Sequence, residues 1–247
     1  MSKIALVTGA SSGVGRSAAL TLAKAGFTVL GCGRSQQGLD ETAASAPDGS
    51  FHFYICDVSD PASVDAMFDQ IRSDHGRLDV VFNNAGNNVQ SQNFGDLSFE
   101  DWRHVISVNL DGAFLIANRA YRMMRDQSPQ GGRIINNGSI SAHVPRPGSA
   151  PYASSKHAMT GLTRSIALDG RVHNIACGQI DIGNAASEMT AKMGGGVPQA
   201  DGSIKPEPTM DVDHVGNAVL HMADLPLDAN VLFMTVMSTA MPFVGRG

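Results

Sequence analysis

Lys3-Ile-Ala-Leu-Val-Thr8-Gly9-Ala-Ser-Ser-Gly13-Val-Gly15 joins a short apolar run to a glycine-rich stretch. An apolar run that stops at glycines is typical of a buried strand. Small and apolar residues then recur at helical spacing as far as Ala25. In the order strand, glycine turn, helix, backbone N–H groups at the helix N-terminus can hold a pyrophosphate, with an ordinary tight turn as the alternative. The residues of this predicted phosphate site are Gly9, Ser11, Ser12, Gly13, Val14 and Gly15.

The alternation of strands and helices continues along the chain. Further strands are predicted at 27–31, 51–56, 79–83, 133–136, 172–177 and 231–237. Helices are predicted at 36–45, from Asp60-Pro61 onward, at 99–124 and at 150–168. Strands that alternate with helices of this length indicate parallel β-α-β units. We therefore expect an α/β fold, a doubly wound parallel sheet with helices on both faces.

The 247 residues are expected to form a single domain over 1–247, because α/β domains of this size are common. Glycines and prolines gather between 183 and 210. This stretch is either a linker or a substrate lid, and a lid is favoured because the remaining chain is short for a second domain. Met189, Met193 and Met210 in it either pack or line a pocket.

Charge and cysteine content exclude several function classes. The net charge is −5 and the basic residues are scattered, which disfavours a nucleic-acid partner. Cys32, Cys56 and Cys177 are odd in number and far apart, so neither a disulfide framework nor a zinc site is indicated. No apolar stretch approaches a membrane span. We expect a cytoplasmic protein with no metal, membrane or nucleic-acid partner.

The residues after the second predicted strand bear on cofactor choice. In a doubly wound fold, an acid about 20 residues past the glycines would hold the adenosine ribose hydroxyls. Gly33 stands there, followed by Arg34, whose guanidinium can pair with a 2′-phosphate. A solvated loop arginine is the alternative. The pair favours NADP(H) over NAD(H).

Tyr152-Ala-Ser-Ser-Lys156 places a phenol and an ammonium on one helix face. The cation favours the phenolate, so Tyr152 can exchange protons nearer neutrality. Such a pair is most often a surface feature. Ser139, however, follows a predicted strand at the edge where α/β sheets bind ligands.

The chain resembles the short-chain dehydrogenase/reductase family, whose features occur in family order over residues 3 to 184. They are Gly9, Gly13 and Gly15, Asp57-Val58, Asn83-Asn84-Ala85-Gly86, Asn109, Ser139, Tyr152 and Lys156. The resemblance implies a Rossmann-type fold, a nicotinamide cofactor and hydride transfer. It implies that Tyr152 is the general acid/base, that Lys156 lowers its pKa and holds the nicotinamide ribose, and that Ser139 positions the substrate oxygen. Asn109 would support a proton-relay water beside Lys156. The other implied cofactor contacts are Asp57 to the adenine, Val58, Asn83 on the cofactor floor, Ala85 and Gly86.

The sequence departs from the family after the predicted strand at 172–177. The family usually has Pro-Gly and then Thr, whereas this chain has Cys177-Gly178-Gln-Ile180-Asp-Ile182. By the same comparison Gly178, Ile180 and Ile182 would contact the cofactor, Ile180 through its backbone. The threonine hydroxyl that the family usually has at this point is therefore missing, and Asn184 is a candidate to replace it.

The expected function is therefore an NADP(H)-preferring oxidoreductase that interconverts a small-molecule carbonyl compound and a secondary alcohol. An NAD(H)-dependent enzyme of the same family and a catalytically idle nucleotide-binding sensor or assembly protein are the alternatives. The resemblance also suggests a homodimer or homotetramer built on the long helices around 109–124 and 152–168.

Overall fold

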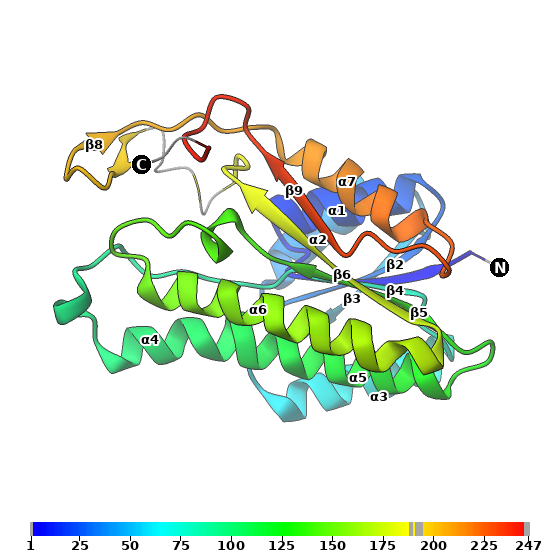
Figure 1. The fold of residues 1–247 in the computed structure, drawn as a ribbon. Helices are drawn as coiled ribbons and strands as arrows, with labels where there is room; N and C mark the ends of the chain where they lie inside the picture. Colours follow the sequence, from blue (N-terminus) through cyan, green and yellow to red (C-terminus); the bar gives the residue numbers. More distant parts are fainter. Residues whose placement is uncertain (1, 188–189, 191–194, 245–247) are drawn as a thin grey trace.

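A computed structural model describes residues 2–187, 190 and 195–244. Its centre is a seven-stranded parallel sheet in the order β3-β2-β1-β4-β5-β6-β9 (Figure 1). The strands are β1 (Ile4–Thr8), β2 (Thr28–Gly33), β3 (Phe51–Ile55), β4 (Val80–Asn83), β5 (Gly132–Asn137), β6 (Ile175–Gly183) and β9 (Phe233–Met237). Because all are parallel, their carboxyl ends meet at one edge, the edge where such sheets bind ligands.

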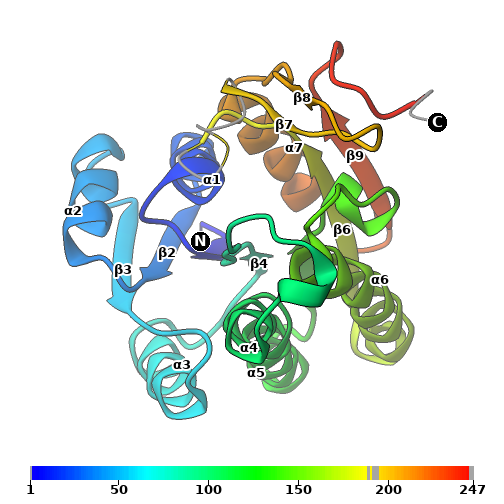
Figure 2. The same cartoon turned by 90° about the vertical axis from the view of Figure 1, so that its left-hand side faces the viewer.

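Helices cover both faces of the sheet, as Figure 2 shows end-on. One layer contains α1 (Gly13–Lys24), α2 (Gln36–Ser45) and α7 (Val212–Asp224). The other contains α3 (Pro61–His75), α4 (Phe99–Ile106), α5 (Ala113–Asp126) and α6 (Ala150–Asp169). Each layer buries its own apolar cluster against the sheet, so the predicted doubly wound architecture is confirmed.

Local chemistry accounts for several boundaries. Asp60 caps α3 by accepting hydrogen bonds from the N–H groups of Ala62 and Ser63, and Pro61 follows at the first helical position. Gly76 ends α3 with φ of 72°, a conformation that costs glycine little. The predicted helix from Asp60-Pro61 is confirmed.

Two predicted elements differ from the structure, and one helix was not predicted. The strand predicted at 172–177 is wrong at both ends, because residues 170–173 form a 3₁₀ turn and β6 runs on to Gly183. The helix predicted over 99–124 is divided by a π-helical segment, Ser107–Gly112. Helix α7 was not predicted, although Asp211 caps it and Val215, Val219 and Met222 recur at helical spacing.

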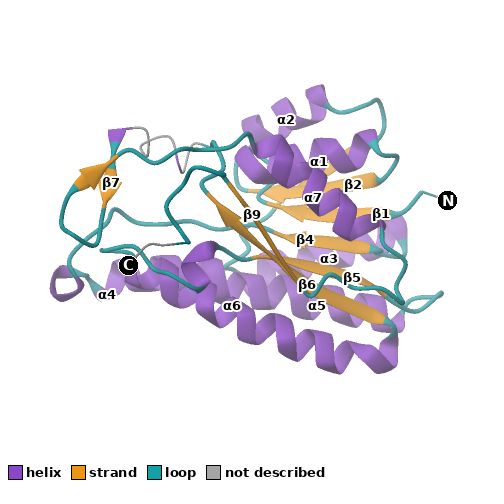
Figure 3. Ribbon diagram, turned by 45° about the horizontal axis from the view of Figure 1, so that its top comes forward, coloured by secondary structure: helices purple, strands orange, loops and turns teal. Residues whose placement is uncertain are grey.

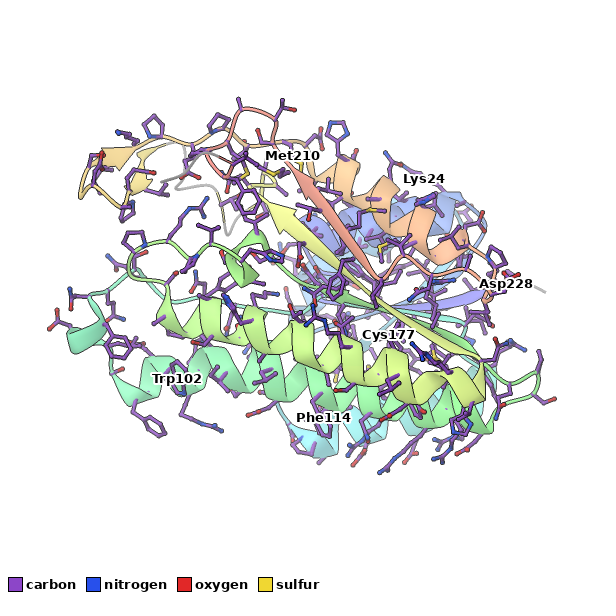
Figure 4. All side chains as sticks on the ribbon, viewed as in Figure 1. Lys24, Trp102, Phe114, Cys177, Met210 and Asp228 are labelled. Carbon is purple, nitrogen blue, oxygen red and sulfur yellow. The ribbon has the colours of Figure 1, made fainter. Side chains whose placement is uncertain are left out.

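The described residues of the segment 183–210 lie over the carboxyl edge of the sheet (Figure 3). Its described part contains a hairpin of β7 (Val197–Pro198) and β8 (Ile204–Lys205). A bridge between Ala185 and Met210 closes the segment where it rejoins α7 (Figure 4). Met189 and Met193 lie outside the described residues. Within the described ranges, no helix is long and apolar enough to cross a membrane.

Candidate active site

The glycine turn lies at the carboxyl end of β1 and leads into α1. Gly9 and Gly13 have φ of 68° and 51°, and a Cβ at Gly15 would lie 2.1 Å from the Gly9 carbonyl oxygen. Ser12 stands at the N-cap of α1, and its side chain makes no capping hydrogen bond among the described residues. The first-turn N–H groups of α1 are therefore open to an anion.

Arg16 fixes this turn from behind. Its guanidinium donates to the carbonyl oxygens of Ser11 at 2.5 Å and Gly38 at 3.1 Å, and to the Thr42 hydroxyl at 3.0 Å. Thr8 adds a second anchor, because its hydroxyl accepts hydrogen bonds from the N–H groups of Asn84 and Ala85, both at 2.8 Å. The carboxyl ends of β1 and β4 are thus held together.

Gly33, Arg34 and Asp57 meet at the ends of β2 and β3. The Arg34 side chain is 69% exposed, and its nearest guanidinium nitrogen is 4.0 Å from an Asp57 carboxylate oxygen. Asp57 accepts from the N–H of Ser59 at 3.0 Å and from its hydroxyl at 2.7 Å. The Ser59 hydroxyl is the main cause that holds the pKa of Asp57 below its usual value. Val58 is buried beside the π-helical segment.

Asn109 is buried in the π-helical segment and ties three parts of the site together. Its amide oxygen accepts from the Asn87 N–H at 2.8 Å, and its amide nitrogen donates to the Asn87 carbonyl at 2.9 Å and to the Ser155 hydroxyl at 3.3 Å. Gly86 lies against it, since a Cβ there would be 3.2 Å from the Asn109 oxygen. Insertion of a π turn at a functional site is a common way to redirect a side chain.

Asn83 is buried at the end of β4. Its side chain donates to the Ala113 carbonyl at 2.8 Å and to the Asn136 side chain at 3.1 Å. The side chain therefore links the sheet to α5.

Ser139, Tyr152 and Lys156 come together at the carboxyl end of β5. Lys156 donates from Nζ to the Asn137 carbonyl at 2.7 Å, and Nζ lies 5.5 Å from the centre of the Tyr152 ring. Burial lowers the pKa of Lys156 to about 8, although the charge of Asp181 raises it in part.

The Tyr152 side chain is partly buried. Burial raises its pKa above 10, while a hydrogen bond with Ser139 and the charge of Arg146 act in the opposite direction. In the chain alone, desolvation outweighs these two effects, and the expected lowering of this pKa by Lys156 stays a prediction.

The model of the short chain dehydrogenases matches residues 3–196. The chain belongs to the short-chain dehydrogenase/reductase family. A 3beta-hydroxysteroid dehydrogenase of Mediterraneibacter gnavus is 38% identical over 72% of this chain, and the match spans only 64% of that relative.

Solved structures of short-chain dehydrogenases superpose closely. Acetoin dehydrogenase from Enterobacter cloacae is 31% identical, with a TM-score of 0.83 over 98% of both chains. A 3-ketoacyl-(acyl-carrier-protein) reductase from Brucella melitensis, complexed with NADH, has a TM-score of 0.84 at 24% identity and covers 95% of this chain and 96% of its own. This last likeness is one of fold alone.

The longer β6 changes which residues of this short-chain dehydrogenase reach the edge of the sheet. Gly178 lies inside β6, opposite Ile135, where a Cβ would come within 2.1 Å of the Val231 carbonyl oxygen. Ile180 is fully buried in the apolar cluster beneath α1 and α7. Only Ile182, of these three, stands next to the strand's last residue. The structure therefore does not bring Gly178 to the glycine turn.

A serine reaches the turn instead. A Cβ on Gly13 would lie 3.2 Å from the Cβ of Ser187. Ser187 thus supplies a hydroxyl near the helix N-terminus, and the true end of β6 at Gly183 would have pointed to it. Asn184, the expected substitute, is engaged elsewhere: it accepts from Arg146 at 2.7 Å and donates to Glu207 at 2.9 Å.

Sequence reasoning also missed two pairs of ionisable side chains at this edge. Arg146 contacts Glu207, which joins the loop between Ser139 and Tyr152 to the segment 183–210. His143 lies 2.8 Å from the buried carboxylate of Asp181. Both pairs join residues far apart in the sequence, so no local pattern signals them.

Proposed function

We propose that this short-chain dehydrogenase is an NADP(H)-preferring oxidoreductase that interconverts a ketone or aldehyde and the corresponding alcohol. One observation carries the proposal: Ser139, Tyr152 and Lys156 converge at the carboxyl edge of the sheet, beside a glycine turn whose helix N-terminus is open. A carbonyl that accepts hydride develops alkoxide charge, so it requires a hydrogen-bond donor and an acid at its oxygen.

The residues present fit a dinucleotide. The uncapped first turn of α1 would hold its pyrophosphate, with Ser11 to Gly15 along the turn. Asp57 and Val58 would flank the adenine, and Ala85 and Gly86 would line the ribose side. When bound, the nicotinamide supplies or accepts the hydride.

The chain's own residues handle the proton. Tyr152 donates it to the substrate oxygen, and Ser139 orients that oxygen. Lys156 carries a positive charge that favours the phenolate once the proton has left. Asn109 holds the Asn87 backbone beside Ser155. From this position Asn109 can support a chain of water molecules toward Lys156.

Cofactor preference rests on Gly33 and Arg34. No carboxylate stands at Gly33 to repel a 2′-phosphate, and Ser11 Oγ lies 3.5 Å from where a Cβ at Gly33 would be. Arg34 is largely exposed, so its guanidinium is available to pair with that phosphate. A charged hydrogen bond of this kind contributes about 1.5–3 kcal/mol, or about a tenfold to hundredfold preference. The family offers a second basic position just before Gly13, but this chain has Ser12 there, so we expect the lower end of that range.

The test is an assay of NADPH and NADH with a panel of carbonyl compounds that includes acetoin and a 3-ketosteroid, the compounds suggested by the relatives' names. Turnover with a higher kcat/KM for NADPH supports the proposal, and Gly33→Asp with Arg34→Ala should reverse the preference. Wild-type preference for NADH would make Arg34 a solvated loop residue. Cofactor binding without turnover of any carbonyl would favour the idle nucleotide-binding protein.

Three further properties belong to the proposal. The segment 183–210 would act as a substrate lid, supported by its position over the edge and by the Arg146–Glu207 pair. Association into a homodimer or homotetramer would use the outer faces of α5 and α6. A cytoplasmic location is supported by three buried free thiols.

A further inference from the structure

Asp181 is a buried carboxylate in the middle of the site, and none of the roles above uses it. It stands on β6, only 1% exposed, beside Thr235 of β9. Its Oδ1 accepts from the Ser139 N–H at 3.0 Å and from the Gln179 amide at 2.7 Å. A buried carboxylate is costly unless its oxygens are fully engaged, so its presence at an active site calls for a specific benefit.

The backbone just after β5 leaves room for this carboxylate. A Cβ at Gly138 would lie 2.0 Å from Asp181 Oδ1, so any larger residue there would displace it. The hydrogen bond from the Ser139 N–H then fixes the residue whose hydroxyl faces Tyr152. The position of Ser139 and the charge of Asp181 are therefore coupled through one oxygen atom.

The charged groups around Asp181 come from two elements. His143, in the loop after the 3₁₀ turn Ile140–Ala142, lies 2.8 Å from Oδ2, with its side chain 48% exposed. Lys156 approaches from α6 and is held at the Asn137 carbonyl. Arg146, from the loop before α6, acts on Tyr152. The described partners from β5 and β6, Asn137 and Gln179, are uncharged.

We propose that Asp181 is a positioning residue for the reaction: its carboxylate holds the Ser139 backbone and provides the negative charge that keeps the Lys156 ammonium protonated, while His143 covers it on the solvent side. The inference rests on the proposed function. Burial alone drives Lys156 toward its neutral form, and a neutral amine can neither favour the phenolate nor donate all its hydrogen bonds. Asp181 opposes that loss.

The first test needs no substrate. The chain has five lysines, so selective ¹³C labelling at lysine Cε gives few NMR signals, and Lys156→Met assigns the one of interest. We expect it to titrate near pH 8 in the wild type and about one pH unit lower in Asp181→Asn. Asp126→Asn removes the same charge from the far end of α5 and should leave the midpoint unchanged. Equal midpoints in all three proteins would overturn the proposal.

The second test uses turnover. One limb of the plot of kcat/KM against pH reports the ionisation of Tyr152 and Lys156. In Asp181→Asn this limb should move to lower pH by the same amount, about one pH unit. The KM for the cofactor should change little. A uniform loss of rate with an unmoved profile would indicate a structural role and contradict the inference. If no carbonyl compound were reduced, the proposed function would be wrong. The NMR titration would still show whether the charge of Asp181 raises the pKa of Lys156. Asp181→Ser is the second variant, and failure of both variants to fold would make the carboxylate purely structural, which overturns the proposal.

Discussion

Tyr152 is the residue on which the proposed chemistry depends most directly. Tyr152→Phe removes the exchangeable proton and leaves the ring in place. General acid catalysis commonly contributes about 10²–10⁴ in rate, so we expect kcat to fall by that factor while NADPH affinity, measured by fluorescence titration, stays within about twofold. Tyr121→Phe is the matched control, because that phenol donates to the Asp169 carbonyl away from the site. Near-normal turnover in Tyr152→Phe would remove the residue from the mechanism.

The charge of Lys156 serves the proposed reaction but destabilises the fold. Its pKa is lowered to about 8 in the folded chain by burial, so below that pH the fold carries a buried charge. Between pH 8 and the usual value of 10.5 the unfolded chain binds more protons than the folded one, and stability therefore rises with pH. Lys156→Met should abolish turnover yet raise the free energy of unfolding at pH 7 by about 3 kcal/mol, less the cost of leaving the Asn137 carbonyl unpaired.

Urea unfolding at pH 7 and pH 9.5 checks this expectation. The advantage of Lys156→Met should shrink at the higher pH, because Lys156 in the folded wild type is then largely neutral. A variant less stable than the wild type at pH 7 would show that the ammonium is a net stabiliser of the fold.

At the scale of elements, Arg133 holds the loop between α7 and β9. Its side chain on β5 is buried and donates to the Asn230 side chain at 2.9 Å and to the carbonyls of Leu225, Pro226 and Ala229 at 2.9–3.2 Å. Asn230 in turn donates to the Cys177 carbonyl at 2.7 Å, which ties the loop to β6. Cys177 itself lies in the interior, among the residues between the sheet and the α3 to α6 layer (Figure 4).

Arg133→Lys keeps the charge but loses the planar fork that reaches several acceptors at once. We expect it to lower the free energy of unfolding by about 2–4 kcal/mol in urea melts. Arg125→Lys, a surface arginine paired with the neighbouring Asp126, should change stability by less than about 0.5 kcal/mol. Equal costs for the two substitutions would mean that the buried contacts contribute no more than a surface pair.

The segment 183–210 is the element we expect to respond to ligand. Its hairpin has two residues in each strand, and Ile204 is 62% exposed. Few buried contacts allow local opening, so amide hydrogens at 197–205 should exchange rapidly in the free chain and more slowly with NADPH and substrate bound. Equal protection in both states would contradict the lid.

The alternation of apolar runs and glycine turns predicted most strands and helices, because each signal there is local. The strand predicted at 172–177 stops one residue before Gly178, whereas β6 continues through it, and a glycine is required there because the Val231 backbone approaches closely. The proposed catalytic residues could be predicted because they lie in short local motifs and follow one another in the order that is typical of the family. The contacts of Asp181 and Ser187 depend on sheet register and on how the chain returns over the edge, and these are long-range properties of the fold.

At the scale of the whole molecule, α5 and α6 each expose one large apolar side chain, Phe114 and Leu168. Phe114 is 49% exposed and lies on the helix layer away from the sheet (Figure 4). A hollow of about 510 Å³ beside it is lined by Leu110, Leu115 and Leu162, together with Pro61, Ser59 and Asp111. Contiguous apolar surface of this kind marks interaction sites, and two copies related by a two-fold axis would each fill the other's hollow.

We therefore expect sedimentation at micromolar concentration to show a dimer or tetramer, and Phe114→Glu to dissociate it, because a carboxylate buried in an apolar interface has no partner there. Ile55→Glu is the control: Ile55 is 53% exposed, but it lies on the edge strand β3, on the opposite side of the sheet order from β6. Dissociation by both variants would place the contact elsewhere, and a wild-type monomer would refute self-association. Since α6 also carries Tyr152 and Lys156, loss of the interface should lower kcat along with the sedimentation coefficient if the contact helps to hold that helix in place.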